Sequence, residues 1–121
     1  MAWNVKFYPD FEKEAIKYSE EVRLELAAYI KLLAEFGYEL SRPHADTLKN
    51  SKYPNMKELR FKADNGVWRV AYAFDPTRNG ILLIAGDKSG MSERLFYTKL
   101  IKKADERFGH HLAELKNRGN S

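Results

Sequence analysis

An arginine occupies the middle of the most apolar segment of this sequence. Arg69 lies directly between Trp68 and Val70. Burying a guanidinium without a partner is unfavourable, so Arg69 requires either an oppositely charged neighbour or a solvated face. Large apolar side chains alternate with smaller ones in residues 67–75, which predicts a strand with Arg69 on the face opposite Trp68 and Val70.

The preceding segment, residues 57–63, alternates in the same way and predicts a second strand. Pairing the two strands collects these side chains on one face: Glu58, Arg60, Lys62, Arg69, Ala71 and Ala73. Arginine binds phosphate through two parallel hydrogen bonds, and lysine supplies a point charge. We therefore predict a shallow cationic floor over the two alanines, suited to phosphate.

Two further residues are candidates for chemistry near this floor. Lys88 lies in the glycine-bracketed loop of residues 86–90, whose backbone N–H groups either form an anion nest or simply turn the chain while Lys88 stays solvated. Tyr97 falls in the first turn of a predicted final helix, either in the core or with its hydroxyl over the floor. Beside cations a tyrosine can stack on a base, or exchange a proton if its pKa is lowered.

Other polar residues point to simpler interpretations. Glu58 either neutralises the nearby bases, which we favour, or acts as a carboxylate catalyst. The histidines, His44, His110 and His111, lack metal-ligand spacing, and the last two are expected on a solvated helix surface. Serine-hydrolase, nucleotide-binding and zinc-protease motifs are absent from the sequence, so we expect neither a metal nor a cofactor.

The surrounding pattern predicts the elements that position these residues. Residues 3–8 alternate as a strand, and Asp10 is placed to cap a helix. An apolar stripe runs from residue 11 to residue 36, with a break into two helices at Ser19. Residues 64–66 and 76–80 predict hairpin turns, residues 81–85 an internal strand, and residues 38–55 a loop or a short turn of helix. Ser92 is expected to cap the last helix.

These elements predict an α+β fold. An N-terminal strand and two helices pack on a small, mainly antiparallel sheet, followed by a C-terminal helix. With 121 residues, we expect one domain over residues 1–121. The net charge of +4 permits binding to a polyanion without requiring it. There is no cysteine, signal peptide or membrane-spanning segment in the sequence, which predicts a cytoplasmic protein with no membrane partner.

Three sequence segments, PNMKELR, GVWRVAYAFDP and ILLIAGDKSG, resemble those of the RelE/ParE toxin superfamily, specifically its HigB-like branch related to phage Gp49. The resemblance covers nearly the whole chain. It implies the toxin of a type II toxin–antitoxin pair, which enters the ribosomal A site and cleaves mRNA without a metal. It also implies a cognate helix-turn-helix antitoxin, through which alone the toxin would contact operator DNA.

The resemblance assigns roles to individual residues. Arg69 is expected to bind the scissile phosphate, Lys88 to stabilise charge or protonate the leaving oxygen, and Tyr97 to stack on a base or help activate the 2′-hydroxyl. Substrate-binding positions follow from the basic residues of the preceding strand: Lys57, Arg60 and Lys62. Glu58 stands where some relatives place a lysine, so the general base stays open among Lys88, Tyr97 and Glu58.

Two other functions stay open from the sequence. The same scaffold supports a ParE-like toxin that binds and inhibits a topoisomerase, because a fold does not determine a function. A toxin-derived binding module without activity is the third possibility.

Overall fold

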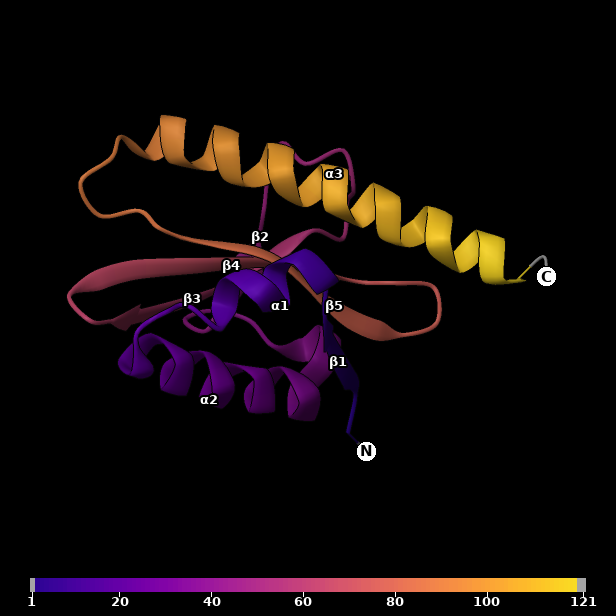
Figure 1. Ribbon diagram of the computed structural model, residues 1–121, viewed down its shortest axis with the longest axis horizontal. Coiled ribbons are helices and arrows are strands. Elements are labelled where there is room, and N and C mark those ends of the chain that lie inside the picture. The colour runs from indigo at the N-terminus through magenta and orange to yellow at the C-terminus, as the bar shows by residue number, and fades with distance from the viewer. Residues whose placement is uncertain (1, 120–121) are drawn as a thin grey trace.

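A five-stranded sheet with helices on both faces forms the molecule (Figure 1), and the computed structural model describes residues 2–119. The elements are β1 (Asn4–Phe7), α1 (Pro9–Ala15), α2 (Glu20–Phe36), the short 3-10 helix η1 (Gly37–Glu39), β2 (Ala45–Thr47), β3 (Lys57–Ala63), β4 (Gly66–Phe74), β5 (Asn79–Asp87) and α3 (Glu93–Gly119). The strand order is β1-β5-β4-β3-β2. Only the edge strand β1 pairs in parallel, with β5. The predicted α+β fold is confirmed.

The N-terminal helices begin where local chemistry favours a start. The side chain of Ser19 accepts a hydrogen bond from the backbone N of Val22 at 3.3 Å, as predicted for a cap between two helices. The predicted cap at Asp10 is wrong. Tyr8 is the N-cap of α1 and Pro9 is its first residue, because the fixed φ of proline suits the first helical position.

The turns follow prediction more closely than the long connection before them. Asp64 and Asn65 have φ of 50° and 60°, the left-handed conformation that a two-residue hairpin turn needs. Residues 38–55, expected to be a loop or a short turn of helix, include the end of the helical turn η1 and also the strand β2, which was not predicted. The strand β2 has only three residues, so its pairing with β3, and not its own alternation, defines it.

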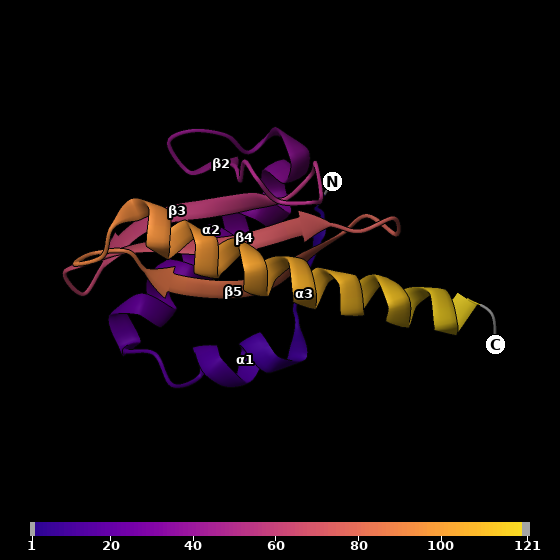
Figure 2. The same cartoon turned by 90° about the horizontal axis from the view of Figure 1, so that it is seen from above.

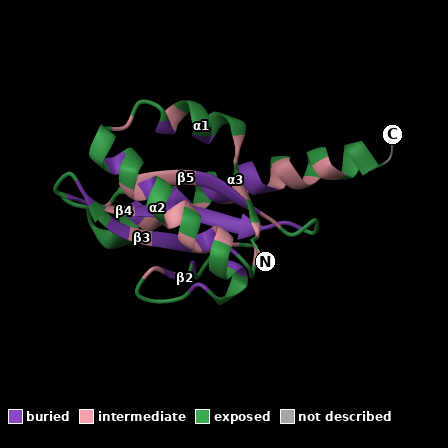
Figure 3. Ribbon diagram, turned by 90° about the horizontal axis from the view of Figure 1, so that it is seen from below, coloured by how far each residue is buried: buried purple, intermediate pink, exposed green. Residues whose placement is uncertain are grey.

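Two hydrophobic cores lie on opposite faces of the sheet. The core under α1 and α2 includes the face predicted for it, Leu59, Phe61, Val70, Tyr72 and Phe74, with Trp68 partly buried against it. The second core lies under α3 and is built from Leu48, Met56, Ala71, Ala73, Ile81, Leu83, Phe96, Leu100, Ala104 and Phe108. Figure 3 shows β3, β4 and β5 largely buried and the outer surfaces of the helices exposed.

The second core corrects the predicted open floor. Ala71 and Ala73 are fully buried beneath α3 and line no exposed surface. The apolar side of α3 needs a surface to cover, and small side chains allow a helix to approach a sheet closely. Figure 2 shows α3 running along the sheet and extending past its end. Beside the start of α3, the face stays open near β2 and β3, where Glu58 and Arg60 line a cavity.

Polar contacts attach the C-terminal half of α3 to the rest of the fold. Arg107 forms two hydrogen bonds to the Glu14 carboxylate, at 2.9 and 2.6 Å, and a third to the carbonyl of Leu83 at 2.8 Å. His111 contacts the buried Asp75. The expectation that His111 lies on a solvated surface is therefore wrong, because it packs against the β4–β5 turn. Among residues 2–119, no helix is both long enough and apolar enough to cross a lipid bilayer.

Candidate functional site

Arg69 has a partner instead of a solvated face. It lies in β4, paired in register with Arg60 of β3 and Gly86 of β5, and is 6% exposed. Its Nε donates to the hydroxyl of Tyr97 at 3.1 Å and lies 3.7 Å from the Glu58 carboxylate. Its Nη1 donates to its own strand, at the carbonyl of Trp68. These contacts give the Arg69 guanidinium two hydrogen bonds and a nearby carboxylate beneath the start of α3.

Glu58 connects the cationic residues of the cluster. It is only 3% exposed, and its Oε2 accepts a hydrogen bond from Nη1 of Arg60 at 2.8 Å. Its Oε1 accepts one from the hydroxyl of Tyr97, also at 2.8 Å. One carboxylate thus lies between two guanidinium groups, the neutralising arrangement favoured from the sequence. We call the group of Glu58, Arg60, Arg69 and Tyr97 the strand cluster.

The hydroxyl of Tyr97 is a hydrogen-bond donor at neutral pH. Burial raises the pKa of this phenol, and the hydrogen bond to Glu58 raises it further, outweighing the opposite effect of Arg69. Arg69 acts to lower the pKa of Tyr97, but the net direction is upward, so the condition set for proton exchange by this tyrosine, a lowered pKa, is not met. Tyr97 lies near the start of α3, one position after Phe96, whose side chain is buried in the core. This position brings the Tyr97 hydroxyl to Glu58 and Arg69.

Lys88 lies beside the strand cluster and carries its own ion pair. Its Nζ is 2.7 Å from the carboxylate of Glu93 and 5.8 Å from the centre of the Tyr97 ring. Of the two alternatives for this loop, an anion nest or a simple turn of the chain, its hydrogen bonds favour the turn. Oδ1 of Asp87 already accepts the backbone N–H of Ser89 and the N–H of Val67, so the loop supplies its own anion.

The two remaining predicted lysines lie away from the cluster. Lys57 is on the opposite face of β3, where its Nζ donates to the carbonyl of Leu40 at 3.3 Å, because its odd position shares the face of the apolar residues. Lys62 shares the face of Arg60 but lies exposed near the β3–β4 turn, paired in register with Val67. The structure therefore brings together Arg60, Arg69, Lys88 and Tyr97, and leaves Lys57 and Lys62 apart.

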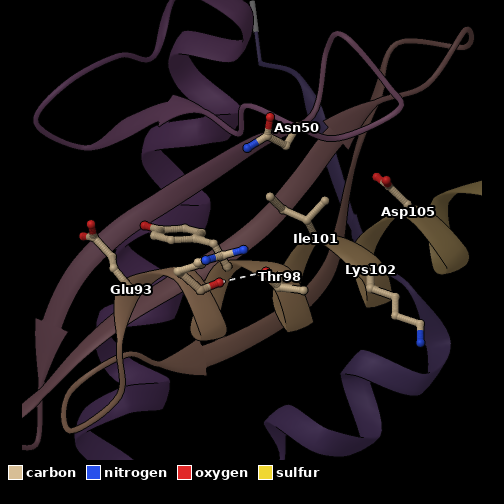
Figure 4. A pocket seen from close by; sticks show the side chains of 8 residues that line it. Asn50, Glu93, Thr98, Ile101, Lys102 and Asp105 are labelled. Atoms are coloured by element: carbon tan, nitrogen blue, oxygen red, sulfur yellow. Dashed lines mark hydrogen bonds between the residues drawn. The ribbon is translucent and has the colours of Figure 1, made fainter.

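A cavity of about 330 Å³ opens beside the strand cluster. Its walls come from the segment before β3, from β3 itself and from α3, and include Arg42, Lys49, Asn50, Glu58, Arg60 and Tyr97. A second cavity of about 650 Å³ adjoins it along α3 (Figure 4). Arg42, Lys49 and Asn50 carry no signal in the sequence, since they lie in a segment without periodicity. Within residues 2–119, no cluster of three or more histidine and carboxylate side chains is placed to hold a metal.

The architecture is that of the RelE toxins. A solved structure of a mutant of the E. coli toxin RelE in the free state aligns with a TM-score of 0.65 and 16% identity, covering 88% of this chain and 98% of that one. Residues 13–109 match the family described as Phage derived protein Gp49-like (DUF891), and the chain belongs to this family.

Two proteins of Mycobacterium tuberculosis (strain ATCC 25618 / H37Rv) are similar in sequence. The one named "Putative toxin HigB2" is 42% identical over 91 residues, which are 74% of this chain and 45% of that protein. The chain therefore spans less than half the length of this relative. The one named "Putative toxin HigB3" is 37% identical over 105 residues, which are 87% of this chain and 90% of that protein.

Proposed function

We propose that this protein is the toxin of a type II toxin–antitoxin pair and an endoribonuclease that cleaves mRNA on the ribosome. The family, the two relatives named as toxins and the RelE-like fold support this proposal. The observation that carries it is the strand cluster, in which two arginines, a tyrosine and a carboxylate meet beside an open cavity.

The cleavage reaction needs no cofactor in this scheme. The 2′-hydroxyl of the RNA attacks the adjacent phosphorus and the bond to the 5′ oxygen breaks, which gives a 2′,3′-cyclic phosphate and a 5′-hydroxyl. The protein positions the nucleophile, removes one proton, supplies another and stabilises charge on the phosphate. In this proposal we assign removal of the proton from the 2′-hydroxyl to Glu58, whose carboxylate otherwise neutralises the two arginines, and protonation of the leaving oxygen to Lys88.

Accessibility separates the roles of the two arginines. The side chain of Arg60 is 23% exposed and borders the cavity, whereas that of Arg69 is 7% exposed beneath Tyr97. We assign the first contact with the phosphate to Arg60, together with Lys88. Arg69 positions Tyr97 and Glu58, and it reaches the phosphate itself only when the Tyr97 side chain rotates away.

The proposed partners follow from the same function. A cognate helix-turn-helix antitoxin would hold the toxin inactive and would carry any contact with operator DNA. The ribosomal A site would present the mRNA, in the cytoplasm where translation occurs. The test of this part is the gene neighbourhood: a gene for a small helix-turn-helix protein beside this one would support it, and the absence of such a gene would contradict it.

The test is to map cleavage on translated mRNA after inducible expression. We expect breaks with the wild type and with Lys116→Ala, an exposed residue far along α3, and a loss of cleavage of about 10²-fold with Arg60→Ala, Arg69→Ala or Lys88→Ala. Intact mRNA and normal growth with soluble wild-type protein would overturn the proposal. Altered DNA supercoiling with intact mRNA would instead indicate a topoisomerase inhibitor.

A further inference from the structure

Two adjoining cavities lie near the strand cluster. Both are lined by Asn50, Glu93, Tyr97 and Ile101, so the two cavities lie side by side along α3, and we treat them as one groove. The groove runs from Glu58 and Arg60 at one end, along α3, to Lys102 and Asp105 at the other. In Figure 4, Asn50 lies across from Ile101, with Glu93 and Asp105 toward the two ends. The groove is therefore longer than a site for a single phosphate at the strand cluster needs to be.

The wall opposite α3 is firmly attached to the helix. Asp105 accepts hydrogen bonds from the hydroxyl of Ser51 at 2.5 Å and from the backbone N of Lys52 at 3.1 Å. Tyr53 packs edge-on against Phe108, with ring centres 5.0 Å apart. These contacts hold residues 50–53 over α3. The groove therefore has two fixed walls, which favours recognition of an extended ligand over adventitious binding.

The excess charge in the groove is positive. Asp46 forms an ion pair with Arg42, Glu58 with Arg60 and Glu93 with Lys88, whereas Asp105 accepts hydrogen bonds from residues 51 and 52 and keeps its negative charge. Lys49, Arg94 and Lys102 line the groove and make no ion pair within residues 2–119. Arg94 and Lys102 lie about 12 Å apart along the axis of α3. This distance is several times the ~3.4 Å between neighbouring nucleotides of a stacked nucleic-acid strand.

Polar and flat side chains between these cations suit bases. Asn50 holds the left-handed conformation, with φ of 75°, and it presents a side-chain amide that can both donate to and accept from a base edge. Tyr97 and Ile101 offer apolar surface on which a base can stack. Cations that track a backbone, with an aromatic ring between them, are the usual features of a site for single-stranded nucleic acid.

We propose that this groove binds the single-stranded RNA that flanks the cleavage point. Lys49, Arg94 and Lys102 contact its phosphates, and Asn50 reads one base next to the scissile bond. The inference rests on the proposed function, since it extends the substrate away from the strand cluster. It assigns binding to residues that take no part in the proton transfers.

The test measures binding separately from cleavage. The probe is a fluorescent single-stranded RNA oligonucleotide with 2′-O-methyl groups, which lacks the nucleophile, and its anisotropy is followed across a range of salt concentrations. The groove variant is the triple Lys49→Ala, Arg94→Ala, Lys102→Ala. The control is the triple Lys31→Ala, Lys103→Ala, Lys116→Ala, which removes the same charge at exposed positions outside the groove.

We expect the groove variant to bind about tenfold more weakly at ~0.15 M salt, with a slope of log affinity against log salt that is less steep by about 2, near 0.7 for each lost contact. For the control variant, the slope of log affinity against log salt should stay closer to the wild-type slope than it does for the groove variant. Equal effects of the two triples, or no binding by the wild type, would overturn the proposal. Thermal unfolding of both triples checks that each is folded.

A single substitution tests the base contact. Asn50→Gly keeps the left-handed backbone and removes only the amide. On translated mRNA it should relax the base preference at one position beside the cleavage point, and an unchanged preference contradicts the role of Asn50. The two proposals fail separately: RNA binding in the groove without cleavage refutes only the nuclease, and cleavage without groove-dependent binding refutes only this inference.

Discussion

Nε2 of His111 lies 2.7 Å from Oδ2 of Asp75, whose side chain is completely buried where β4 ends. Oδ1 of Asp75 accepts hydrogen bonds from the backbone N of Thr77 and of Asn79 and from the Thr77 hydroxyl. This carboxylate therefore joins the β4–β5 turn to the C-terminal half of α3. Burial acts to raise the pKa of Asp75, but the hydrogen bonds from His111, Asn79 and Thr77 outweigh it and hold the pKa below its usual value.

This contact predicts a contribution of Asp75 to acid stability. A lowered pKa means that the unfolded chain binds the proton more tightly, so the stability from Asp75 is present above the unfolded pKa and is lost as the pH falls through the folded one. Asp75→Asn should lower the free energy of unfolding at pH 7 by about 1–3 kcal/mol and flatten its decline below about pH 4. Urea unfolding at a series of pH values measures both. Asp64→Asn, at an exposed turn position that asparagine tolerates, is the control, and coincident curves for both variants would refute the role of Asp75.

The hydroxyl of Tyr97 links Arg69 to Glu58, so its removal should affect cleavage more than folding. Tyr97→Phe keeps the ring and loses both hydrogen bonds. We expect the rate of mRNA cleavage to fall about 10- to 100-fold, and the free energy of unfolding to fall by about 1–2 kcal/mol. Cleavage kinetics and urea unfolding give the two values. Tyr38→Phe, on an exposed ring, should change neither, and wild-type cleavage by Tyr97→Phe would exclude the hydroxyl from the reaction.

Glu58 compensates two guanidinium groups in a nearly closed environment, so its charge should matter for stability. Glu58→Gln should lower the free energy of unfolding by about 3–5 kcal/mol, because it leaves Arg69 buried without a counter-charge. The matched control is Asp46→Asn, which breaks the exposed ion pair with Arg42. This substitution should lower the free energy of unfolding by about 1 kcal/mol or less. Chemical denaturation compares them. If both substitutions have the same small effect, the strand cluster is not electrostatically coupled in the way the geometry indicates.

Gly86 lets α3 pack directly on β5 where the strand passes Arg69. A Cβ added to Gly86 would lie 2.9 Å from Cε1 of Phe96, a residue of the second core. Gly86→Ala should therefore displace Phe96 and lower the free energy of unfolding by about 1–3 kcal/mol. It should also slow cleavage, since Tyr97 follows Phe96 on α3. Gly119→Ala, where an added Cβ meets nothing within 4 Å, provides the control for both measurements. Stability equal to that of the wild type would show that α3 shifts freely over β5.

Local chemistry was enough to predict most of the elements. The alternation of residues 57–63 and 67–75 is strong because each strand covers a core, and the caps and turns at Ser19, Asp64 and Asn65 act over a few residues. The strand β2 was missed because three residues carry no period, and the start of α1 was misplaced at Asp10 because proline preference and side-chain capping compete there.

The sequence by itself determined which face of β4 carries Arg69, since side chains in a strand alternate whatever surrounds them. Only the tertiary structure decided that this face is mostly covered. Helix α3 needed an apolar surface and the alanines of β4 supplied one, a long-range packing choice that periodicity does not contain. The same packing brought Tyr97 to Arg69 from 28 positions along the chain, placed Glu58 between the arginines and opened the groove beside residue 50. An arginine in an apolar strand is thus predictable locally, but its partners are a property of the assembled fold.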